Sequence, residues 1–198
     1  AMARFGITDP HDYKPIKGQF RYAEDLTPDY RWYNGFAGRY LRGQAFEPGE
    51  VLALNPPRGG VGDATARIFP FKIHRGKQPY DLGHKYLLIP KTFGRDGFWG
   101  MTNAKEHSVE ERWHLSFIRG AKIHGLAYSG AETGEHAFGW AETEMFWPQV
   151  HMVGPADQAL QCNDCHPDDG EPGRLDWAAL GYPGDPAEVG GRLQNGLV

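Results

Sequence analysis

One long stretch of the chain has the apolar spacing of a surface helix. Between residues 104 and 125, apolar side chains recur every four positions, with further apolar residues beside them. Such spacing is typical of an amphipathic helix that buries one face. The stripe consists of Val109, Trp113, Phe117 and Ala121. We therefore predict a helix over 104–125, capped at its start by Thr102 or Asn103.

Shorter elements are predicted on either side of this helix. Pro155 suits the first position of a helix, and alanine and leucine follow it, which predicts a second helix over 155–165. Residues 68–74 and 85–90 are rich in β-branched and aromatic residues between prolines and glycines. They predict two short strands, joined by a polar loop over 75–81.

The first 67 residues show neither the apolar period of a helix nor that of a strand, and they are interrupted by prolines and glycines. We expect them to wrap the rest as extended loops, with a tight turn at Asn34-Gly35 that permits a small hairpin. A length of 198 residues, with 27 glycines and 15 prolines, suits one turn-rich domain. The predicted fold is mainly α with long irregular loops and a few short strands. It is a single domain over 1–198, with a wrapping region at 1–100 and a helical region at 101–198.

The charge pattern argues against two classes of partner. The net charge of −4 comes from 21 basic and 25 acidic residues, without a dense basic run. Nucleic-acid binding is therefore not expected. The longest apolar runs fall far short of the roughly 20 residues that a membrane-spanning helix needs, so no membrane span is expected.

The two cysteines of the chain stand beside a histidine in Cys162-Asn163-Asp164-Cys165-His166. This spacing is the attachment signature of a c-type haem. Each thiol bonds to one vinyl group of the porphyrin, and the adjoining imidazole binds the iron from the proximal side. The motif predicts one covalently attached haem c, bound by Cys162, Cys165 and His166, with His166 as the proximal iron ligand.

Three other chemistries use a pair of cysteines at this spacing. A zinc site needs two further ligands, a thioredoxin-like pair normally follows a strand, and a small disulfide loop is the third. Residues 158–161 look like the end of a helix, and a histidine follows the pair directly, so the haem interpretation is favoured. Because haem is attached covalently outside the cytoplasm, we expect an exported, periplasmic protein whose signal peptide has been removed.

The second axial position of the iron decides between an electron carrier and a protein that binds small molecules. Burial beside apolar residues favours three candidates for the distal ligand, in the order His151, His74 and His136. A straight helix over 155–165 would hold His151 far from the proximal side, so that His151 would more naturally ligate a haem of another chain. An open position would instead favour a haem enzyme or gas sensor, with a pocket built from His136, Tyr128 or Arg119.

Several segments together carry a resemblance to a known family. They are 142–153, 159–166 and 173–182, with 13–18, 30–35, 69–72 and 76–81 upstream. These segments resemble the C-terminal part of the octahaem tetrathionate reductase family of multihaem c-type cytochromes. The resemblance implies a periplasmic redox protein whose last haem, on the Cys162–His166 motif, is bis-histidine ligated and passes electrons along a chain.

The sequence departs from that family because it holds a single haem motif. Reduction of tetrathionate, nitrite or hydroxylamine is therefore not implied for it. The chain would be a natural single-haem relative, a subunit that docks on a multihaem partner, or a fragment.

From these observations we predict a monohaem electron-transfer cytochrome with a six-coordinate, bis-histidine haem, and not an enzyme. The expected partner is a redox protein such as a multihaem or membrane cytochrome. Arg174, Lys72 or Lys77 would steer a haem propionate or this partner. The haem enzyme or gas sensor with an open sixth position is the alternative.

Overall fold

The structure is a computed structural model that describes residues 13–14, 18–19, 26–103, 107–150, 154–168 and 173–198. The chain forms two compact units. Unit 1 comprises Ala1–Leu26 and Leu88–Phe138, and unit 2 comprises Thr27–Leu87 and Gly139–Val198. Each unit thus combines two separate parts of the sequence. Our expectation of one domain, made of a wrapping region over 1–100 and a helical region over 101–198, stays a prediction.

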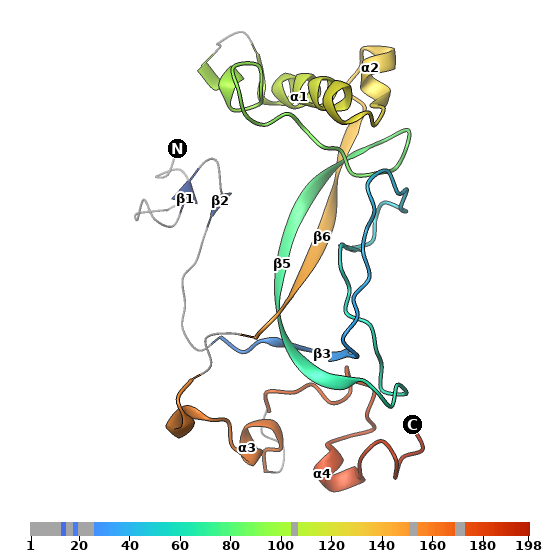
Figure 1. The fold of residues 1–198 in the computed structure, drawn as a ribbon, viewed down its shortest axis with the longest axis vertical. Coiled ribbons are helices and arrows are strands. Elements are labelled where there is room, and N and C mark those ends of the chain that lie inside the picture. The colour runs from blue at the N-terminus through green and yellow to red at the C-terminus, as the bar shows by residue number, and fades with distance from the viewer. Residues whose placement is uncertain (1–12, 15–17, 20–25, 104–106, 151–153, 169–172) are drawn as a thin grey trace. The chain divides into compact units, whose positions relative to one another are not determined.

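A four-stranded sheet is the framework of unit 2 (Figure 1). Its strands are β3 (Asp29–Tyr33), β4 (Leu52–Ala53), β5 (Arg67–Asp81) and β6 (Phe138–Pro148), in the order β3-β5-β6-β4. β3 runs antiparallel to β5, with Asp29 opposite Phe71 and Tyr33 opposite Arg67. β4 runs parallel to β6. The two long strands therefore lie in the middle of the sheet.

Aromatic rings join three of these strands. Phe71 on β5 is buried, and its ring meets the rings of Tyr33 on β3 and Phe146 on β6 edge-on, at centroid distances of 5.4 and 6.3 Å. Such pairs add about 0.5–1.5 kcal/mol each beyond the burial of apolar surface. They hold β3 and β6 in register with the strand between them.

Unit 1 contains the helices that lie before β6. These elements are η2 (Gly100–Asn103), α1 (Val109–His124) and α2 (Ser129–Thr133), together with the paired two-residue strands β1 (Tyr13–Lys14) and β2 (Gly18–Gln19). On α1, Phe117 is buried between Trp113 and Tyr128. Trp113 in turn stacks on Phe98 at 4.0 Å. The predicted apolar stripe is thus confirmed over the central part of the helix.

α1 begins later than predicted. Ser108 is its N-cap, because its hydroxyl oxygen accepts a hydrogen bond from the backbone amide of Glu111 at 3.1 Å. Thr102 and Asn103, the predicted caps, belong instead to η2. Gly125 ends the helix in the left-handed region, at a φ of 76° that glycine adopts without strain.

The prediction of a mainly α fold is wrong. β5 and β6 have 15 and 11 residues, and α1 is the only described element of comparable length, with 16. Residues 75–81, predicted as a polar loop, continue β5. All side chains over 74–78 are exposed, so this part of the strand lacks the alternation that marks a half-buried strand. Residues 85–90, predicted as a strand, contribute only a single bridge between Leu87 and Tyr80.

The prediction of one continuous helix over 155–165 is wrong. The structure has η3 (Ala156–Gln158), an extended segment, and then the short helix α3 (Cys162–Cys165). Gln161 restarts the helix, because its backbone amide donates to the Asp164 carboxylate at 2.7 Å in a capping box. A last short helix, α4 (Pro186–Val189), follows. Across the described ranges, no helix has the length and apolar character needed to cross a membrane.

Candidate functional site

The Cys-x-x-Cys-His motif forms one tight turn of unit 2. Both cysteines lie on α3, and the amide of His166 donates to the carbonyl of Cys162 at 2.9 Å, which closes the turn. Residues three apart on a helix share a face, so the two thiols lie on the same side of α3. Cys162 is exposed and Cys165 is partly exposed, and neither forms a disulfide.

The side chain of His166 is held by a carboxylate 19 residues later. Its Nδ1 atom lies 2.6 Å from Oδ1 of Asp185. Asp185 is the N-cap of α4, and the same oxygen accepts a hydrogen bond from the Ala187 amide at 2.8 Å. The helix cap therefore fixes the carboxylate that meets the imidazole.

The pKa of Asp185 is lowered by these contacts. Its partial burial acts to raise the pKa, but the hydrogen bonds from the Ala187 amide and from His166 outweigh this effect. The carboxylate is thus ionised near neutral pH and accepts, rather than donates, in the contact with His166.

Trp177 packs on the face of the same imidazole. The two rings stack with centroids 5.0 Å apart and an interplanar angle of 19°. The indole nitrogen of Trp177 donates to the carbonyl of Cys165 at 3.2 Å, and Tyr182 packs edge-on against the indole. With one face covered and Nδ1 engaged, the His166 ring has little freedom to rotate.

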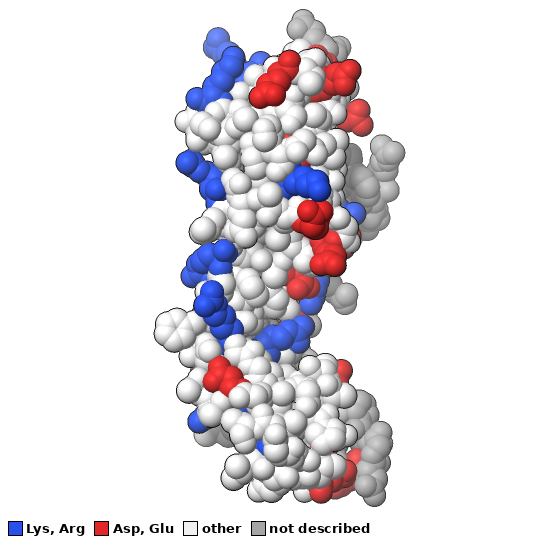
Figure 2. Space-filling model, turned by 90° about the vertical axis from the view of Figure 1, so that its right-hand side faces the viewer, with Lys and Arg blue, Asp and Glu red and all other residues white. Residues whose placement is uncertain are grey.

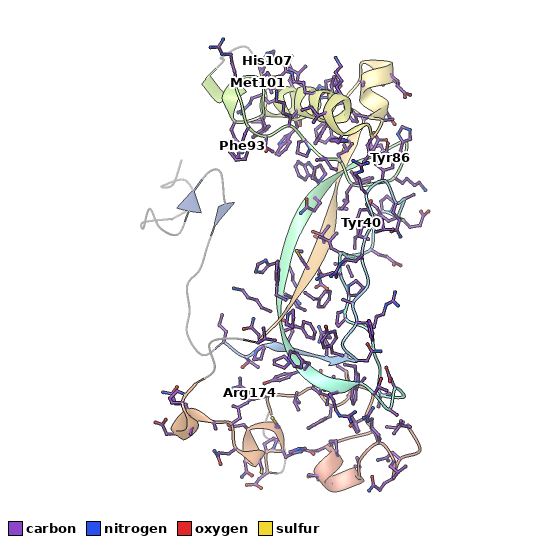
Figure 3. All side chains as sticks on the ribbon, viewed as in Figure 1. Tyr40, Tyr86, Phe93, Met101, His107 and Arg174 are labelled. Carbon is purple, nitrogen blue, oxygen red and sulfur yellow. The ribbon has the colours of Figure 1, made fainter. Side chains whose placement is uncertain are left out.

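Arg174 lies between the motif and β3 (Figure 3). Its amide donates to the Asp164 carbonyl at 2.8 Å, and its Nε atom donates to the Tyr30 hydroxyl of β3 at 3.3 Å. Burial raises the pKa of the Cys165 thiol, and the positive charge of Arg174 partly offsets this rise. Arg174 therefore joins the turn to the sheet and places a cation near the thiols.

A pocket opens between β3 and the segment that follows the motif. Its volume is about 600 Å³. The lining includes Tyr30, Arg31, Trp32, Arg174 and Leu180. Asp29 and Asp176 also line this pocket, and Arg31 is paired with Asp29 at 3.3 Å, so the two guanidinium groups share the pocket with two carboxylates.

The predicted distal ligands have different positions. His151 lies outside the described residues. His74 is exposed on β5 and packs on Trp147 at 5.8 Å, and it makes no described hydrogen bond or ring contact with residues 162–166. His136 belongs to unit 1, where its ring lies 4.7 Å from that of His114. The motif itself belongs to unit 2.

Asp185 and Trp177 are the functional candidates that the sequence did not reveal. Asp185 stands before Pro186, a pair that is typical of an N-cap followed by the first helical residue. That signal predicts the short helix α4 but not the contact with His166. No sequence signal brings Trp177 onto the imidazole, because this stacking depends on the chain reversal between them.

Two basic side chains of β5 are paired with carboxylates of the sheet. Arg75 on β5 lies 2.9 Å from Glu144 and 3.5 Å from Asp29, and Lys77 lies 3.7 Å from Glu142. Figure 2 shows both basic and acidic side chains on the face drawn, with most of the basic ones toward its left edge. The basic residues of β5 therefore do not form a strip of a single sign.

The residues of the motif suit a covalently attached haem. Both thiols are free and lie on one turn, and the imidazole that follows them has its Nδ1 atom engaged. In the described part of the chain, Nε2 of His166 makes no hydrogen bond, so this nitrogen is available to a metal. This is the donor set that haem c requires.

Comparisons with known proteins agree with this site. The family model described as "Cytochrome c bacterial" matches residues 4–169, a range that includes the motif. The crystal structure of octaheme cytochrome c from Shewanella oneidensis is similar over 89% of this chain, with 39% identity and a TM-score of 0.70. The chain spans 38% of the length of that protein. No curated protein matches the chain. The chain therefore belongs to the bacterial cytochrome c family, and its structural relative is a multihaem c-type cytochrome.

Proposed function

We propose that this chain carries one haem c, bonded to Cys162 and Cys165 and ligated by His166, and that it exchanges single electrons with a redox partner in the periplasm. The observation that carries the proposal is the geometry of His166, whose Nδ1 atom and ring face are both engaged. A haem c bound there supplies one-electron exchange between ferrous and ferric iron.

Different residues of the chain bind different parts of the haem. The two thiols of α3 form the covalent links, and Nε2 of His166 points its lone pair to the metal because Nδ1 carries the proton. Arg174 lies next to Cys165 and supplies a positive charge suited to a haem propionate. Trp177 covers the imidazole and excludes water from one face of it.

We propose a second histidine as distal ligand, with His151, His74 and His136 as the candidates. Two protein ligands leave no position on the iron for a substrate, which favours a carrier over an enzyme. Two residues of the alternative distal pocket are already engaged inside unit 1. Tyr128 is buried with its hydroxyl 3.0 Å from Nδ1 of His114, and Arg119 donates to Met101 at 2.8 Å.

We propose a multihaem or membrane cytochrome as the partner. The 39% identity to an octahaem cytochrome supports a place in a chain of haems. Interfaces for electron transfer are small, below about 1,200 Å², so a large apolar docking face is not required. Lys72 and Lys77 on β5 are exposed and would contribute to such an interface.

The first test is an absorption spectrum of the chain matured with haem in a bacterial periplasm. Ferric and ferrous spectra are recorded with and without carbon monoxide, and the intact mass gives the number of haems. We expect one haem and low-spin bands that carbon monoxide does not change. A high-spin spectrum that shifts with carbon monoxide would support the enzyme or sensor, and a chain without haem would overturn the proposal.

Histidine variants identify the distal ligand in the same experiment. We expect one of His151→Ala, His74→Ala and His136→Ala to convert the spectrum to high spin. His107→Ala is the matched control, since this histidine lies 3.0 Å from Glu111 on α1. If the three candidate variants all stay low-spin, none of these three histidines is the distal ligand.

A further inference from the structure

The contact between His166 and Asp185 has a direct bearing on how the imidazole binds a metal. Oδ1 of Asp185 accepts from the Ala187 amide and lies 2.6 Å from Nδ1 of His166. An ionised carboxylate has only acceptor positions, so the hydrogen in this contact belongs to Nδ1. This leaves Nε2 as the nitrogen with a lone pair. Hydrogen bonds of ligating histidines to carboxylates fix the tautomer and raise the basicity of the ligand.

We propose that Asp185 is a positioning residue that fixes the tautomer of His166, increases its electron donation to the iron, and so lowers the reduction potential of the haem. This inference rests on the proposed function, because it requires His166 to ligate the iron. A stronger donor and a nearby negative charge both favour ferric over ferrous iron. Both effects of Asp185 therefore lower the reduction potential of the haem.

Two features of the site support more than an incidental contact. The side chain of Asp185 is 15% exposed, so water weakens its hydrogen bond to His166 less than at an open surface. Trp177 stacks on the imidazole, which hinders rotation of Nδ1 away from the carboxylate. The hydrogen bond is thus maintained from three sides, by the cap of α4, the stacked indole and the turn at α3.

A purely structural role for Asp185 is the competing explanation, since Asp185 also caps α4. Asparagine is as good an N-cap as aspartate, so Asp185→Asn keeps the cap and removes the charge. A second pocket is lined by His166 and Asp185 together with two further carboxylates, Asp168 and Glu188, which have no described bond to His166. Asp168→Asn and Glu188→Gln therefore remove a charge of the same sign nearby without changing the hydrogen bond.

The test is a spectroelectrochemical titration of the haem-loaded full chain and these variants. We expect Asp185→Asn to shift the equilibrium between ferric and ferrous haem about tenfold toward ferrous, equal to about 59 mV for one electron. The two controls should shift it by less than about threefold under the same conditions. The ferric electron paramagnetic resonance spectrum should change in Asp185→Asn and stay unchanged in the controls.

Equal shifts in Asp185→Asn and in both controls would overturn the inference, because a general field effect would then explain them. Asp185→Ser is a second variant, which keeps a capping oxygen and has no charge. We expect a shift in the same direction, and an unchanged potential would count against the inference. If the unmodified chain shows no low-spin haem signal, the proposed function itself is contradicted. The two failures are therefore distinguishable.

Discussion

The indole nitrogen of Trp32 on β3 donates a hydrogen bond of 2.7 Å to the carbonyl oxygen of Leu180, which lies 148 residues later. The same indole is covered by the guanidinium of Arg192 at 4.6 Å and packs against Tyr182 at 6.1 Å. Trp32 thus joins the sheet to the segment that follows the proposed haem site.

Replacement of Trp32 by phenylalanine should destabilise unit 2. Trp32→Phe removes the donor and leaves the carbonyl of the buried Leu180 without its partner, which costs about 1–3 kcal/mol. Urea unfolding followed by far-ultraviolet circular dichroism measures this loss. Trp147→Phe is the control, because Trp147 is 46% exposed and should change stability by less than about 0.5 kcal/mol. Equal losses of unfolding free energy in the two variants would show that the hydrogen bond from Trp32 to Leu180 does not stabilise unit 2.

Gly120 of α1 should tolerate no side chain. A Cβ atom there would lie 2.1 Å from the carbonyl oxygen of Ile89, a backbone atom that cannot move away cheaply. Gly120→Ala is therefore expected to destabilise unit 1 by about 1–3 kcal/mol, as overpacking does elsewhere. Gly76→Ala on β5 meets nothing within 4 Å and should be close to neutral. Thermal unfolding of the two variants distinguishes them, and a neutral Gly120→Ala would contradict this packing of α1.

Asn55 extends the parallel pairing of β4 and β6 with its side chain. Its amide group donates to the carbonyl of Phe146 and accepts from the amide of Phe146, both at 2.8 Å. Asn55→Ala should therefore increase hydrogen exchange at the Phe146 amide by about tenfold, equal to about 1.4 kcal/mol of lost protection. The Lys91 amide of unit 1, bonded to Ser116 at 2.9 Å, is the internal control. Unchanged exchange at Phe146 would contradict the pairing.

Asp63 should make stability depend on pH in the acidic range. Hydrogen bonds from the Thr65 hydroxyl at 2.6 Å and the Asn34 amide at 2.9 Å lower the pKa of this carboxyl below its usual range. Because the pKa is lower in the folded state, the stabilisation is present above the unfolded pKa and is lost as pH falls through the folded pKa. Asp63→Asn should thus destabilise the protein at pH 7 and have less effect at about pH 2–3.

Unfolding measured across this pH range tests the prediction. Thr65→Val removes the hydroxyl bond, the largest cause of the lowered pKa, and should give an intermediate dependence on pH. A difference between Asp63→Asn and the unmodified chain that stays constant from pH 7 to about pH 2 would contradict the role of Asp63.

The motif and the main helix were readable from sequence because their signals are local. The Cys162–His166 spacing requires no tertiary information, and the four-residue period on α1 reflects burial of Phe117 by neighbouring rings. β5 was misread because the exposed residues 74–78 obscure its alternation, and its partners come from distant parts of the sequence. Asp185 was missed for the same reason, since its contact with His166 depends on a chain reversal and not on periodicity.

The separation of these contacts along the chain also bears on the order of assembly. The loop from His166 to Asp185 closes over 19 residues, whereas the loop from Trp32 to Leu180 closes over 148. Loop-closure entropy rises with the logarithm of length, so the longer loop costs about 2 kcal/mol more to close. The contact between His166 and Asp185 therefore costs less conformational entropy to form while the chain is still unfolded. Under the proposed function, covalent addition of haem to Cys162 and Cys165 can then precede the contact of the Leu180 segment with β3 and act as an anchor for later folding.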